Sequence, residues 1–179
     1  MNFLDLQKDL QILIWDTRNE WLADEADTGT VWASNKSAII HGIKEVFDRL
    51  KQNSLYKEQN YTEATLTVSD NKASLPADFE IEHEVLFYDD PTYDYKLNKK
   101  SSEIIFDDIT EWTITLRYLV KENVLSAAID EPYLDEHFKE AISLFAQEKY
   151  HLAQFDWDNV SKSVAYAEDK LEDLISKYF

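Results

Sequence analysis

The order of the hydrophobic patterns along the chain limits its architecture more than any other feature of the sequence. Near both ends apolar residues recur at three- and four-residue spacing, whereas residues 60–122 carry the two-residue alternation of β-strands. Helical ends separated by a long β-rich middle share an interior only by packing against each other. The sequence therefore predicts a helical bundle made from both ends, with the middle projecting from it.

Four helices are predicted, each starting at a residue that favours a helix N-terminus. Asn, Ser and Asp are good N-caps, and Pro132 stands near a first helical position, where its missing N–H costs little. The first helix covers residues 3–22, and the later ones start at Ser34 or Asn35, at Asp130, and at Asp158 or Asn159. The short break at residues 156–158 makes the last two helices an antiparallel hairpin.

The middle of the chain is predicted to form several short antiparallel strands. The clearest strand pattern alternates Trp112, Ile114, Leu116 and Tyr118 with polar residues. The expected fold class is α+β: mainly a helical bundle, with two N-terminal helices and a C-terminal antiparallel helical hairpin, and an inserted small antiparallel β-sheet. We expect a single domain over residues 1–179, with the bundle in 1–55 and 130–179 and the β-rich insertion in 60–122.

Composition excludes several classes of site. The chain has no Cys, which removes disulfides and thiolate chemistry, and two Gly are too few for a phosphate-binding loop. The net charge of -18 argues against static binding to nucleic acid, because phosphate contacts need Lys or Arg. It fits a solubilising surface, an acidic wall that DNA slides past, or docking on a basic partner. Without a signal sequence or a long apolar run, we expect a soluble, unanchored chain.

No catalytic, cofactor-binding or metal-binding residues are predicted, and we expect the protein not to be an enzyme. The string Asp27-Thr28-Gly29-Thr30 matches the aspartic-protease motif, but it follows an acidic helix end rather than an apolar strand. The four His residues lie apart and lack the i, i+4 spacing of a helical metal site. Paired acids such as Asp107-Asp108 lack the spacing of a calcium loop, so we interpret them as solvated turns.

Aromatic residues are the best candidates for an interface. The chain has 5 Trp, 10 Tyr and 9 Phe, and aromatic side chains are enriched where proteins meet. A tyrosine-rich turn at residues 87–95, the break between the last two helices and the final residues are the places where such side chains are expected to be exposed. The interface candidates are Tyr88, Tyr93, Tyr95, Trp157, Tyr178 and Phe179.

Taken in order, these pieces resemble the head-to-tail adaptor (connector) proteins of tailed bacteriophages. The matching strings are Val31-Trp32-Ala33-Ser34 before the second helix, Leu75-Pro76-Ala77-Asp78-Phe79 before a strand, and Pro132-Tyr133 opening the final hairpin, with small residues at Ala141 and Ala146. The resemblance covers nearly the whole chain, although each string is short. Gly42 and Val46 depart from the polar-plus-Ala pair often found there in the family, and the β-rich region is long.

The resemblance implies a structural virion protein without cofactors. Such a protein forms a ring of identical subunits on the portal protein, links it to tail or stopper proteins at the neck of the virion, and is assembled in the host cytoplasm. DNA passes through the ring during ejection without specific binding, and no membrane is involved. An acidic lumen that repels phosphates gives the net charge a role in that passage.

Two other classes of function remain open. The first is a soluble acidic interaction protein without catalytic activity, either another adaptor or an inhibitor whose carboxylates mimic DNA phosphates. Stoichiometry separates it from a ring, because an inhibitor binds a basic enzyme one to one. The second is a small hydrolase that uses scattered acids, whose most literal version depends on Asp27.

Overall fold

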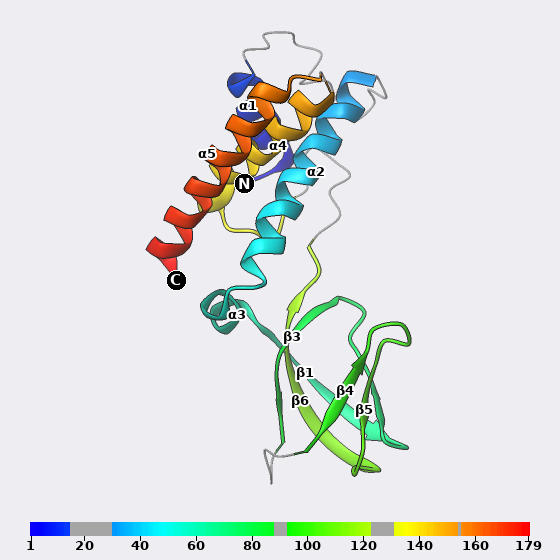
Figure 1. Cartoon of the computed structure of the whole chain (residues 1–179). Helices are drawn as coiled ribbons and strands as arrows, with labels where there is room; N and C mark the ends of the chain where they lie inside the picture. Colours follow the sequence, from blue (N-terminus) through cyan, green and yellow to red (C-terminus); the bar gives the residue numbers. More distant parts are fainter. Residues whose placement is uncertain (15–29, 88–92, 123–130, 154) are drawn as a thin grey trace. The chain divides into compact units, whose positions relative to one another are not determined.

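The computed structural model describes residues 1–14, 30–87, 93–122, 131–153 and 155–179. Within these residues the chain forms five α-helices and one six-stranded antiparallel sheet (Figure 1). Two units have separate interiors. Residues 1–50 and 122–179 make the first, here called the helical unit, and residues 51–121 make the second, the β-rich unit.

Side-chain caps fix where the helices of the helical unit begin. Asn2 accepts a hydrogen bond from the backbone N–H of Asp5, whose carboxylate accepts one from Asn2 in return. Asp135 and Asp156 cap the later segments in the same way, by accepting backbone N–H groups. The segments are α1 (Phe3–Leu13), α2 (Thr30–Leu50), a short 3-10 turn (Glu136–Phe138), α4 (Lys139–Ala153) and α5 (Trp157–Tyr178).

Helix α4 packs against α1, α2 and α5, and its small residues allow close contact with α2. Ala141 and Ala146 are fully buried on α4. Opposite them on α2, a Cβ atom added to Gly42 would lie 2.2 Å from the carbonyl oxygen of Ile142 and 3.0 Å from the backbone nitrogen of Ala146. Only glycine fits such a close approach of two backbones.

The β-rich unit contains one helix and all six strands. Its elements are α3 (Ser54–Asn60), β1 (Thr62–Ser69), β2 (Lys72–Ser74), β3 (Phe79–Leu86), β4 (Tyr95–Asn98), β5 (Glu103–Phe106) and β6 (Glu111–Val120). The strand order is β3-β6-β1-β2-β5-β4, and every neighbouring pair is antiparallel. Strand β6 has the alternating pattern that is clearest in the sequence, and it pairs with both β1 and β3.

The sheet curls around an interior of its own (Figure 1). Irregularities in the register of β3 against β6, between Phe79 and Ile81 and between Glu82 and Glu84, are of the kind that bends a strand and increases its twist. The buried face is apolar and aromatic, and its members are Val68, Ala73, Leu75, Phe79, Ile104, Phe106, Ile109, Ile114, Leu116 and Tyr118. A curled sheet therefore supplies this unit with a core from its own strands.

The predicted fold class is wrong in its proportions. The chain is not mainly a helical bundle with a small inserted sheet, because the sheet has six strands and a separate core. The sheet was predicted to be small because each strand pattern in the sequence is short. Pairing of segments far apart in the sequence, such as Thr62 with Tyr118 and Phe79 with Val120, joins these short strands into one large sheet.

Several predicted boundaries also change. Helix α2 starts at Thr30, before Ser34 or Asn35, and α5 starts at Trp157 behind the cap Asp156. The third helix starts later than predicted, because residues 131–135 are not helical and Asp135 is the cap of the following turn. Helix α3 was not predicted. The first helix ends at Leu13, and the remainder of the predicted span beyond residue 14 lies outside the described residues.

Candidate interaction sites

Tyr93 and Tyr95, two of the interface candidates, contact the interior of the β-rich unit. Tyr93 and Tyr95 are half-buried, with ring centroids 5.3 Å and 6.5 Å from that of Phe87. The hydroxyl of Tyr95 donates to the carboxylate of Glu82. Burial, followed by this hydrogen bond to a carboxylate, raises the pKa of Tyr95 well above its usual value. Tyr88, the third candidate here, lies outside the described residues.

The last two residues of the chain pack onto the 3-10 turn. The ring of Tyr178 lies 4.3 Å from that of His137, and the ring of Phe179 stacks on Phe138 at 6.4 Å with an interplanar angle of 4°. Both side chains are half-buried. These contacts attach the end of α5 to the segment that precedes α4. Part of the surface of both aromatic rings is therefore buried against residues of the same chain.

Trp157 occupies the tip of the hairpin formed by α4 and α5, where its side chain is 63% exposed. Phe155, two residues before it, is 79% exposed and has a positive φ of 57°. A bulky residue rarely adopts this left-handed conformation, which costs about 1–2 kcal/mol relative to the usual one. The structure thus adds Phe155 to the candidates. The sequence feature that could have indicated an exposed Phe155 is its position next to the cap Asp156, in a very short break between two helices.

Hydrogen bonds hold Asp156, the cap of α5, which lies between Phe155 and Trp157. Its carboxylate accepts from the backbone and side-chain nitrogens of Asn159, at 3.4 Å and 2.6 Å, and lies 3.4 Å from Nδ1 of His151. The side-chain hydrogen bond from Asn159 is the main cause that lowers the pKa of Asp156 below its ordinary value. The backbone N–H of Asp156 also donates to His151. Two exposed aromatic residues therefore flank a cap that is held by hydrogen bonds.

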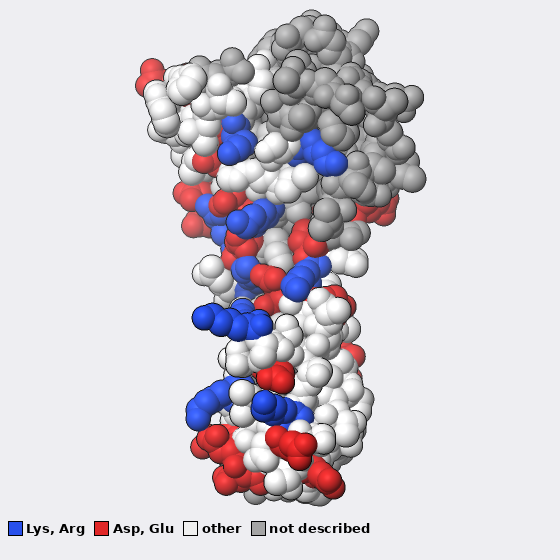
Figure 2. All heavy atoms as spheres, turned by 90° about the vertical axis from the view of Figure 1, so that its right-hand side faces the viewer, with Lys and Arg blue, Asp and Glu red and all other residues white. Residues whose placement is uncertain are grey.

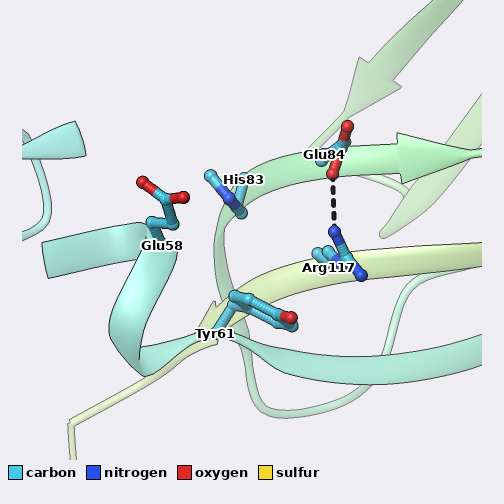
Figure 3. A pocket seen from close by; sticks show the side chains of 5 residues that line it. All are labelled: Glu58, Tyr61, His83, Glu84 and Arg117. Carbon is cyan, nitrogen blue, oxygen red and sulfur yellow. Dashed lines mark hydrogen bonds and ion pairs between the residues drawn. The ribbon is translucent and has the colours of Figure 1, made fainter. Parts of the chain in front are cut away.

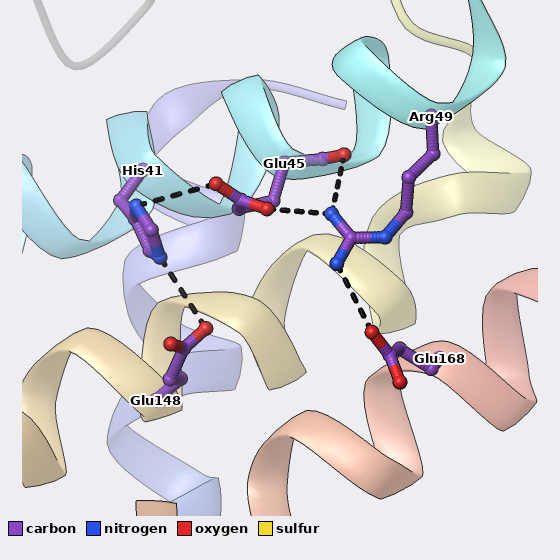
Figure 4. Close-up of polar contacts among 5 residues, drawn as sticks. All are labelled: His41, Glu45, Arg49, Glu148 and Glu168. Atoms are coloured by element: carbon purple, nitrogen blue, oxygen red, sulfur yellow. Dashed lines mark hydrogen bonds and ion pairs between the residues drawn. The ribbon is translucent and has the colours of Figure 1, made fainter. Parts of the chain in front are cut away.

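A chain of ion pairs links three helices of the helical unit (Figure 4). Arg49 on α2 contacts Glu45 at 2.5 Å and Glu168 on α5 at 3.2 Å, while His41 contacts Glu148 on α4 at 3.4 Å. Burial disfavours the charge of Arg49, but the two carboxylates outweigh it and raise the pKa of the guanidinium. Every side chain of the cluster is engaged by another member, and the contacts run between α2, α4 and α5, so we interpret it as a brace between helices rather than a binding site.

An open pocket of about 580 Å³ lies on the β-rich unit beside α3 (Figure 3). The rings of Tyr61 and His83 stack there at 5.6 Å, and the guanidinium of Arg117 lies 4.7 Å from the centre of the Tyr61 ring. Arg117 donates to Glu63 at 2.9 Å and to Glu84 at 3.0 Å. Since two carboxylates already engage this cation, the pocket has little free positive charge for a substrate anion.

The sequence offered two kinds of reactive group, clusters of His and acidic residues and the aspartic-protease string. Among the described residues no group of three His, Cys, Asp or Glu side chains is arranged to hold a metal ion. Asp27, on which the aspartic-protease alternative depends, lies outside the described residues. Its catalytic role stays untested.

Comparison of the sequence with protein-family models and with curated proteins finds no match. Within the described parts of the chain, no helix combines the length and the apolar character needed to cross a bilayer. The α4–α5 tip, with Phe155 and Trp157, is therefore the strongest candidate for a contact surface on physical grounds alone.

Proposed function

We propose that this protein is a structural, non-enzymatic component of a tailed-phage virion. It acts as a head-to-tail adaptor that forms a ring on the portal protein at the neck and links it to tail or stopper proteins. The observation that carries the proposal is the α4–α5 tip, where Phe155 and Trp157 are exposed on either side of the hydrogen-bonded cap Asp156. The order of the sequence strings that resemble the adaptor family supports it as well.

The tip has the properties of an assembly contact. Large aromatic side chains dominate the energetics of protein interfaces, particularly where they enter a pocket on the partner. Positive φ at a bulky residue such as Phe155 is an unfavourable conformation, and such conformations cluster at functional sites. Because hydrogen bonds already hold Asp156 between the two aromatic residues, less conformational entropy remains to be lost there on binding.

The charge of the chain supports passage of DNA without retention. A surplus of 36 acidic over 18 basic residues repels phosphates, since binding needs Lys or Arg to displace counterions. On the face drawn in Figure 2, acidic side chains gather at the lower end of the β-rich unit. A ring whose lumen carried such carboxylates would let the genome slide. A basic lumen, or tight binding of duplex DNA at physiological salt, contradicts this role.

The proposal is tested by mixing the purified protein with portal rings of the same virion. We expect it to co-sediment with the portal and to add a ring density in negative-stain images. The double variant Phe155→Ser/Trp157→Ser should lose portal binding while its circular dichroism stays that of the wild type. Tyr166→Ser is the matched control, because Tyr166 is an aromatic residue of the same unit that is 67% exposed on α5.

The surplus of acids also favours one alternative, a soluble acidic interaction protein that docks on a basic enzyme or acts as a different adaptor. The same experiment separates the two. If the wild-type protein neither forms rings nor binds portal, but instead forms a one-to-one complex with a basic DNA-binding enzyme, the adaptor proposal is wrong.

A further inference from the structure

A small pocket at one end of the β-rich unit is surrounded by lysines. Its volume is about 220 Å³, and it lies where β3 begins and β6 ends. Leu75, Pro76 and Phe79 contribute apolar lining, and Lys99 and Lys121 stand among the residues around them. The pocket belongs to the segment Leu75-Pro76-Ala77-Asp78-Phe79, which leads into β3.

Backbone carbonyl groups hold both ammonium groups at this segment. Lys121 Nζ donates to the carbonyl oxygen of Ala77 at 3.3 Å, and Lys99 Nζ lies 3.4 Å from the carbonyl oxygen of Glu80. Among the residues that the structure describes, neither ammonium has a carboxylate within ion-pair distance. The carboxylate of Glu80 is engaged by Lys51 at 2.8 Å. The pocket lining thus holds two ammonium groups and one carboxylate, that of Glu80, which Lys51 already engages, so the local balance of charge is positive.

This excess runs against the composition of the chain. Acidic residues outnumber basic ones by 36 to 18, yet here the ratio is reversed around a pocket with partly apolar walls. Low-dielectric walls strengthen the attraction of an ammonium group for an incoming anion. A carboxylate matches the pocket in size and charge, and it would accept hydrogen bonds from both lysines.

The opposite end of the same sheet is acidic. Strand pairing of Ser69 with Glu111 and of Tyr95 with Phe106 defines this end, because Lys99 and Lys121 follow the other ends of these strands. The carboxylates there are the exposed pair Asp107 and Asp108, in the connection between β5 and β6, together with Asp70, Asp94 and Glu111. Lys96 lies 3.4 Å from the carboxylate of Asp107 in an exposed ion pair, which is a weak competitor for a partner cation, and the acids still outnumber it.

We infer that the lysine pocket of one subunit receives the Asp107-Asp108 turn of a second copy of this chain. The surplus of acids makes another copy a better source of anions than nucleic acid, which the net charge of -18 repels. A contact between unlike ends is a head-to-tail interface, and such interfaces generate closed rings when the rotation between subunits closes. The inference rests on the proposed ring-forming function and names the surfaces that would join its subunits.

Complementation between two neutralised variants tests this pairing. Lys99→Gln/Lys121→Gln removes the pocket charges, and Asp107→Asn/Asp108→Asn removes those of the turn. Analytical ultracentrifugation should show that each variant self-associates at least about tenfold more weakly than the wild type. An equimolar mixture should form a one-to-one heterodimer and grow no further, because one intact pocket and one intact turn remain. Raising NaCl from about 0.05 to about 0.5 M should weaken the wild-type association through screening.

Matched controls carry the same change in net charge at other places. Lys57→Gln/Lys100→Gln alters two lysines that do not line the pocket, and Asp169→Asn/Asp173→Asn alters two exposed acids of α5. Both controls should associate as the wild type does. Circular dichroism of every variant checks folding, and Asp94→Asn/Glu111→Gln offers a second way to neutralise the acidic end if the Asp107-Asp108 turn does not tolerate substitution.

The inference is overturned if the wild type stays monomeric at millimolar concentration, if the neutralised variants associate like the wild type, or if the mixture gives no heterodimer. Binding of short duplex DNA that is abolished by Lys99→Gln/Lys121→Gln would assign the pocket to phosphate and also overturn it. Portal binding is measured in a separate experiment, so that it can be compared with the heterodimer result. A wild type that binds portal without the heterodimer result loses only this inference, whereas a heterodimer without portal binding counts against the adaptor function alone.

Discussion

The helical unit and the β-rich unit fill their interiors in different ways. In the helical unit, small residues let backbones approach, as at Gly42 on α2 against Ile142 on α4. In the β-rich unit, aromatic rings fill the curl of the sheet, and carboxylates satisfy their hydroxyl groups, as Asp78 does for Tyr118 at 3.0 Å. The first interior should respond mainly to changes of volume, whereas the second should respond also to pH.

The largest expected effect is a cavity in the helical unit. Leu171 is 1% exposed at the middle of α5, so Leu171→Ala should lower the free energy of unfolding by about 2–5 kcal/mol. Urea denaturation measures the loss, and hydrogen exchange should confine it to residues 1–50 and 122–179. Glu172→Ala, on the exposed side of the same helix, is the control and should stay within about 0.5 kcal/mol of the wild type. A melting temperature unchanged by Leu171→Ala would show that the stripe faces outward.

The second largest loss of stability is expected from overpacking at the contact between α2 and α4. Gly42→Ala adds a Cβ within 2.2 Å of a backbone oxygen, so the helices must separate, at a cost of about 3 kcal/mol. The sign of the effect is informative, because alanine in a helix interior otherwise stabilises by about 1 kcal/mol relative to glycine. Lys44→Ala, at an exposed position two residues later, is the matched control. A gain in stability for Gly42→Ala would mean that the two backbones are not in close contact.

A smaller effect should appear in the β-rich unit at alkaline pH. Burial, together with the hydrogen bond to Asp78, raises the pKa of Tyr118 to about 12. An unfolded tyrosine ionises near pH 10, so the stability that Tyr118 contributes is complete below that value and is lost as the pH approaches about 12. Tyr118→Phe should cost about 1 kcal/mol at neutral pH and flatten this alkaline loss.

Urea titrations at a series of pH values, with hydrogen exchange to assign the change to residues 51–121, measure this prediction. Tyr133→Phe is the control, since Tyr133 is 63% exposed. If Tyr118→Phe retains the full alkaline slope of the wild type, the buried hydroxyl does not contribute to it.

The smallest expected effect concerns a buried hydroxyl group of the helical unit, in contrast to the hydrogen-bonded hydroxyl of Tyr118 in the β-rich unit. Ser143 on α4 is 2% exposed, and within the described residues its hydroxyl has no hydrogen-bond partner. Ser143→Ala removes this group and raises helix propensity, so stability should stay constant or increase by about 0.5 kcal/mol. Thermal unfolding with Ser37→Ala on α2 as a reference tests it. A clear loss of stability would reveal a partner for the hydroxyl.

Local signals in the sequence predicted the helices better than the sheet as a whole. The apolar stripe of α5 and the alternation in β6 are properties of neighbouring residues, and both elements are found where these patterns lie. The observed ends of the helices differ from the predicted ones because several neighbouring residues could each cap the same helix. Asp156, rather than Asp158 or Asn159, caps α5, and Asp135 caps the turn before α4.

The candidate contact surfaces depended even more on the fold. Trp157 was predicted as exposed and is so, but the sequence did not distinguish it from Tyr178, whose ring packs on His137. Phe155 gains its importance from its backbone conformation, which no residue pattern encodes. The lysine pocket unites residues from the start of β3, the β4–β5 turn and the end of β6, so it exists only once the strands have paired.

By itself, the sequence determined the helical character of both ends, the strand character of the middle and the strongly acidic balance of the chain. These properties follow from the spacing and chemistry of adjacent side chains. Tertiary structure alone decided that six short strands join into one curled sheet with its own core, and that lysines and acids collect at its opposite ends. The reason is that strand pairing and the two ends of a sheet are defined by contacts between residues distant in the chain, which local patterns do not specify.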